Sequence, residues 1–96
     1  MSHYTPSTQH QLIDGVFSPD DARSILMALI EHKIQFHERD GWSKKERLGK
    51  TDEHGARRIR QLQQTKADLA DLIDAAGDSA ERLAIRCTIE ISQVSE

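Results

Sequence analysis

Residues 18–40, SPDDARSILMALIEHKIQFHERD, carry the strongest structural signal in the chain. Ser18 is a favourable helix cap, Pro19 suits the first helical position, and the two carboxylates after it suit the positive end of a helix. Apolar residues then recur at helical spacing through the rest of the stretch. We predict a helix over about residues 19–40, ended by Gly41.

This first helix has more apolar surface than one partner can cover. Six consecutive apolar residues, Ile25 to Ile30, spread around most of its circumference, whereas a surface helix has a single apolar stripe. The stripe that we expect to face a second helix consists of Ala22, Ile25, Leu29 and Phe36. The stripe that we expect to need another partner consists of Leu26 or Met27, Ile30 and Ile34.

A second long helix is predicted over about residues 52–76, after a connector at 41–51. Its apolar seam has spacings of three and four residues, as in a coiled coil, with one polar break at a lysine. The seam consists of Ile59, Leu62, Lys66, Leu69, Ile73 and Ala76. Two helices of similar length with a short connector predict an antiparallel hairpin.

The segment at about residues 84–92 fits two patterns. Apolar residues from Leu83 to Ile91 alternate strictly with polar or small ones, and β-branched residues are frequent, which favours a strand. A third helix within residues 78–94 is the alternative. A lone strand needs a neighbour for its backbone groups. The weak apolar patch Leu12–Phe17 and the same strand of a second copy are the two candidates.

The chain has 96 residues, a mass of 10.9 kDa and 36% hydrophobic residues. We predict a mainly α single domain at residues 12–96, a flexible N-terminal arm at 1–11, and completion of the fold by a homodimer or higher oligomer. The oligomer interface is predicted to include Met27, Ile30, Ile34, Ile85, Ile89 and Ile91.

Little in the sequence points to catalysis or cofactor chemistry. Gly49-Lys50-Thr51 resembles only the tail of a phosphate-binding loop, because the glycine of that motif five positions earlier is a lysine here. No histidine pair has metal-ligand spacing, and the single cysteine, Cys87, excludes an internal disulfide. We expect no enzyme activity, cofactor, metal or membrane span, and a cytoplasmic location.

Charge is segregated along the chain. The segment from Lys44 to Arg60 has seven basic and three acidic residues, a net +4, whereas the whole chain carries −3. This places a basic surface at the tip of the predicted hairpin, beside the only tryptophan. The residues predicted to bind a partner there are Trp42, Lys44, Lys45, Arg47, Arg57 and Arg58.

The combination favours a small protein-interaction, assembly or adaptor protein that acts as a homo-oligomer. Its partners are expected to be copies of itself and a protein at the basic tip. A nucleic-acid-associated accessory protein is the alternative, although the overall acidic balance argues against it.

Overall fold

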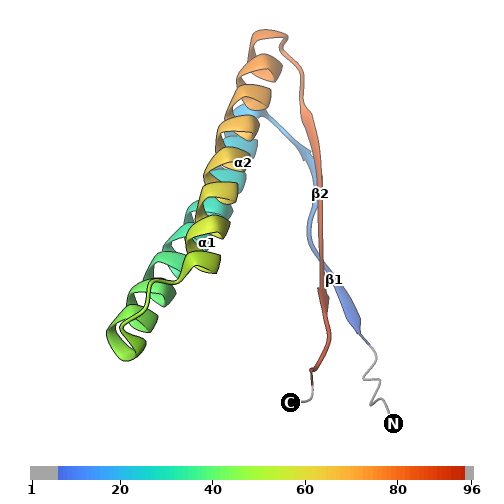
Figure 1. The fold of residues 1–96 in the computed structure, drawn as a ribbon. Helices are drawn as coiled ribbons and strands as arrows, with labels where there is room; N and C mark the ends of the chain where they lie inside the picture. The colour runs from blue at the N-terminus through green and yellow to red at the C-terminus, as the bar shows by residue number, and fades with distance from the viewer. Residues whose placement is uncertain (1–6, 95–96) are drawn as a thin grey trace.

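The structure is a computed structural model and describes residues 7–94. Its elements in chain order are β1 (Thr8–Phe17), α1 (Pro19–Leu48), α2 (Glu53–Asp78) and β2 (Leu83–Ile91). The helices form a long hairpin, and the strands form an antiparallel two-stranded ribbon (Figure 1). The predicted mainly helical hairpin with a C-terminal strand is therefore present. Residues 1–6 of the predicted arm lie outside the described part, and residues 8–11 belong to β1.

Helix α1 begins as predicted but runs about two turns further than the predicted end at residue 40. The Asp21 backbone N–H donates to Ser18 Oγ at 3.2 Å, so Ser18 is the cap. The helix continues through Gly41 to Leu48, which corrects the predicted connector at 41–51. It ends at Gly49, which has a φ of +67° and donates its N–H to the Lys45 carbonyl at 2.8 Å. Glycine adopts the left-handed conformation without strain, so Gly49 is a favourable helix end. Gly41 remains inside the helix although glycine has a weak preference for helical conformation.

Helix α2 begins at a side-chain cap and also passes a glycine. Asp52 accepts a hydrogen bond from the Gly55 backbone N–H at 3.1 Å. The helix ends at Asp78, two residues beyond the predicted end at residue 76, so Gly77 is its penultimate residue. The position of Gly77 beside Pro19 places the end of α2 against the start of α1.

The core lies along the seam between the two helices. Ile30 and Ile34 of α1 pack with Leu62 of α2, and Ile59 and Leu69 lie against this cluster. The α2 seam predicted from the heptad spacing is confirmed by the burial of Leu62, Ile73 and Ala76.

The assignment of the two α1 stripes was wrong. Ile30 and Ile34 are buried against α2, whereas Leu29 and Phe36 are exposed. Both stripes have helical spacing, and only the tertiary register decides between them. Ile30 and Ile34 are therefore internal in one copy and are not free for the oligomer interface predicted for them.

The C-terminal segment is a strand, and its neighbour comes from the same chain. β2 pairs antiparallel with β1 in a register that includes Phe17↔Leu83, Gly15↔Ile85 and Ile13↔Cys87. The irregularity between Gln11 and Ile13 leaves Leu12 without a partner. This pairing excludes the third helix and selects the patch Leu12–Phe17 as the neighbour of β2, in place of the β2 of a second copy.

The ribbon and the hairpin are two arms that meet at one end. There β1 leads into α1 and α2 leads into β2, and the arms then diverge (Figure 1). Of the two helices, α1 makes the larger contact with the strands. The Cα radius of gyration is 17.4 Å, against about 12.5 Å for a compact domain of this length. The chain is therefore far more open than a typical domain.

Candidate interaction surfaces

The hairpin tip gathers the predicted partner-binding residues from two helices. Trp42 and three cationic residues lie in the last turns of α1, and two arginines lie in the first turns of α2. The Trp42 side chain is 66% exposed although it belongs to a helix and not to a loop. The basic tip consists of Trp42, Lys44, Lys45, Arg47, Arg57 and Arg58.

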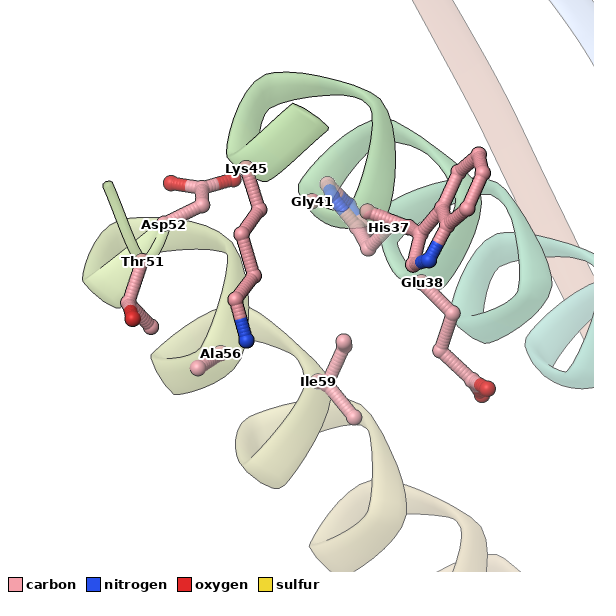
Figure 2. A pocket seen from close by; sticks show the side chains of 9 residues that line it. His37, Glu38, Gly41, Lys45, Thr51, Asp52, Ala56 and Ile59 are labelled. Atoms are coloured by element: carbon pink, nitrogen blue, oxygen red, sulfur yellow. The ribbon is translucent and has the colours of Figure 1, made fainter. Parts of the chain in front are cut away.

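A shallow hollow of about 260 Å³ lies at this tip between the two helices (Figure 2). Gly41, Ala56 and Ile59 contribute apolar surface, and Trp42 lines it as well. In Figure 2 the Lys45 side chain extends from α1 toward Ala56 of α2. The remaining lining residues are His37, Glu38, Thr51 and Asp52. The hollow therefore combines an apolar floor with charged groups of both signs.

Lys44 has a structural role that separates it from the other tip cations. Its Nζ lies 3.0 Å from the Asp40 carboxylate and 3.5 Å from the Asp52 carboxylate. The hydrogen bond to Asp40 is the main reason why the pKa of Lys44 is raised above 10.5. The pKa of Asp52 is lowered below 3.8, chiefly by the Gly55 N–H, with Lys44 as a further cause. Lys44 thus joins the end of α1 to the cap of α2.

The other four cations of the basic tip are exposed to solvent. Within residues 7–94, none of Lys45, Arg47, Arg57 and Arg58 forms an ion pair. Arg58 donates one hydrogen bond to Gln61 Oε1 at 3.2 Å. The basic tip therefore carries four exposed cations that are not neutralised by ion pairs within the described residues.

A second surface begins where the two arms meet and becomes more exposed with distance from that end. On α1, Ala22 is fully buried, Leu29 is 41% exposed and Phe36 is 49% exposed. On the corresponding face of β2, Leu83, Ile85 and Cys87 are half-buried, whereas Ile89 is 38% exposed and Ile91 is 55% exposed. Apolar residues therefore continue along both arms beyond the end where the arms are buried against each other.

The predicted oligomer residues fall into three groups. Ile89 and Ile91 are exposed, Met27 and Ile85 are half-buried, and Ile30 and Ile34 are buried in the hairpin. The exposure of Leu29 and Phe36 was missed. The spacing of three and four residues occurs in both α1 stripes, so the sequence has no signal that selects one of them as the seam.

The described residues contain no group of three or more His, Cys, Asp or Glu side chains arranged to hold a metal ion. In the same part of the chain, neither helix is long and apolar enough to cross a membrane. Comparison with models of protein families, with curated proteins and with solved structures gives no match to this chain.

Proposed function

We propose that this chain is a self-assembling protein-interaction or adaptor protein. It works by recognition between surfaces and carries out no bond chemistry. Self-association covers the apolar faces of the two arms, and the basic tip remains available to a different protein.

One observation carries this proposal: the chain exposes more surface than a folded monomer of its size. Its accessible surface is 7810 Å², whereas a compact monomer of 10.9 kDa exposes about 5600 Å². The excess of about 2200 Å² per chain falls in the range that obligate homodimers bury on each subunit, about 1,000–2,500 Å². The exposed apolar residues on the arms contribute to this excess.

Sedimentation equilibrium of the full chain at micromolar concentration tests self-association. We expect a mass that is a multiple of 10.9 kDa and that is retained at high salt, because apolar burial is not screened by ions. A single species of 10.9 kDa would overturn the proposal.

The basic tip is tested through Trp42, whose fluorescence reports on this surface alone because the chain has no other tryptophan. A short acidic peptide that carries one leucine should shift the emission to shorter wavelength, and the shift should weaken as salt increases. The same peptide with amides in place of its carboxylates is the matched control. Equal shifts with both peptides, or none with either, would contradict an acidic protein partner.

A nucleic-acid-associated function is the second candidate, and the net +4 of residues 44–60 favours it. An exposed tryptophan among cations can also stack on a base. Ala56 and Ile59 give the same hollow an apolar surface that would hold an apolar side chain such as leucine, which supports the protein partner instead. Retention of single-stranded DNA or RNA that falls linearly with the logarithm of salt concentration would favour the second candidate.

A further inference from the structure

We propose that two copies of this chain clasp each other reciprocally, with the apolar face of each ribbon lying on the exposed α1 stripe of the other copy. The inference rests on the self-association proposed above and names the surfaces that carry it. The clasp surfaces are the ribbon positions Ile89 and Ile91 and the α1 positions Leu29 and Phe36, all exposed in one copy.

The ribbon presents one apolar face that lacks a cover at its far end. Successive residues of a strand point to opposite faces, so Leu83, Ile85, Cys87, Ile89 and Ile91 share one face. Burial along β2 follows this alternation up to Cys87 and then stops. A two-stranded ribbon is marginally stable by itself, and packing of one face against a helix stabilises it. The far half of the ribbon therefore needs a helix that its own chain does not supply.

Helix α1 presents an apolar pair on its exposed side. Leu29 and Phe36 are seven residues apart and lie on one face of the helix, beyond the buried Ala22 of the same face. The distance between them is about 10 Å at 1.5 Å per residue. Ile89 and Ile91 are about 7 Å apart on the exposed end of the ribbon at 3.3 Å per residue, with His10 and Thr8 opposite them on β1. The exposed parts of the two surfaces therefore have similar lengths, and each has two apolar side chains.

The two arms of one chain are held apart at their junction. Ser18 is the only residue between β1 and α1, and it also caps α1. The next residue is Pro19, whose ring restricts its φ. The second connection, from α2 to β2, spans the short segment from Ser79 to Arg82. These short connections hinder closure of the ribbon onto its own α1 and favour a second copy as the occupant.

In a dimer with two-fold symmetry, both copies have both of their clasp surfaces covered. When the ribbon of one copy lies on α1 of the other, symmetry places the second ribbon on the first α1. Each chain then loses exposed surface on both of its arms. This double cover accounts for the large excess of accessible surface per chain better than a contact through one arm alone.

Cysteine pairing between copies tests the clasp. Two single-cysteine variants are made in the Cys87→Ser background: Ile89→Cys, and Phe36→Cys with a tag that makes the chain heavier. After mixing under conditions that allow exchange and mild oxidation, we expect the mixed disulfide to exceed either self-disulfide. Glu90→Cys, on the opposite face of the ribbon, replaces Ile89→Cys as the matched control and should give at least tenfold less mixed product.

The other outcomes overturn the clasp in distinct ways. A predominant self-disulfide of Ile89→Cys would mean that two ribbons pack face to face. A disulfide within one chain of the double variant Ile89→Cys/Phe36→Cys, at high dilution, would mean that the arms of one copy close on each other. A dimeric mass by sedimentation without mixed disulfide would refute the clasp and leave self-association intact, whereas a monomeric mass would refute both.

Discussion

Replacement of Ile73 by alanine should destabilise the chain strongly, because this is the most completely buried large side chain described. Ile73 is 1% exposed and lies in the α2 seam. The substitution removes three carbon atoms, about 2.4 kcal/mol at about 0.8 kcal/mol for each buried methylene. A residual cavity adds to this loss, and measured Ile→Ala costs run from about 2 to 5 kcal/mol. We expect a loss of about 3 kcal/mol from the free energy of unfolding.

The measurement is urea unfolding followed by circular dichroism of the helices. All samples are compared at one chain concentration, because the proposed self-association would contribute to the apparent stability. Leu72→Ala is the matched control, since Leu72 is the adjacent residue of the same helix and is exposed. We expect the control to lose less than about 1 kcal/mol. Equal losses of unfolding free energy for the two variants would refute the burial of Ile73 in the seam between the two helices.

Three further predictions concern the helix ends and the seam. Gly55→Ala should lower the melting temperature because a Cβ there would overlap the Asp52 carboxylate. In Gly41→Ala the new Cβ meets only ordinary contacts, so this variant should gain up to about 1 kcal/mol of stability. Equal effects of the two substitutions would contradict the cap geometry. Because the pKa of Asp52 is lowered in the folded chain, its negative charge stabilises the fold above pH 3.8, and this contribution is lost as the pH falls further. Asp52→Asn should therefore reduce the loss of helicity at acidic pH in a circular dichroism titration. An unchanged loss of helicity at acidic pH would count against this role of Asp52. Lys66→Leu should raise the urea concentration at the unfolding midpoint, because leucine would complete the apolar seam. The ion pair of Lys66 with Glu31, at 3.0 Å, is largely exposed and contributes little stability. A lower midpoint would show that the ion pair contributes more than the burial of leucine.

The long-range features of the fold were the hardest to predict from the sequence. The α2 seam and the β2 alternation were correct because both follow from local periodicity. The choice between the two α1 stripes failed because local periodicity is the same for both. β1 was read as a weak patch because its sequence contains Asp14-Gly15, a turn signal, and its strand is specified by pairing with distant β2.

The tip shows the same division between local and tertiary information. Its composition was evident from the clustering of cations around Trp42. The extension of α1 past Gly41 was missed because a glycine just after the last residue of an apolar helical pattern resembles a helix end. The separate role of Lys44 was not predictable, since it depends on the approach of Asp52 from the other helix.

The pairing of the first strand with the last has a consequence for the order of folding. Thr8 pairs with Ile91, so the ribbon joins the two extremes of the described chain. Contacts between such distant positions form slowly unless intervening structure brings them together, and the hairpin does this. During synthesis β1 leaves the ribosome before the helices, and β2 leaves after them. The helices therefore act as the folding template, and the ribbon is the last part of the described chain to form.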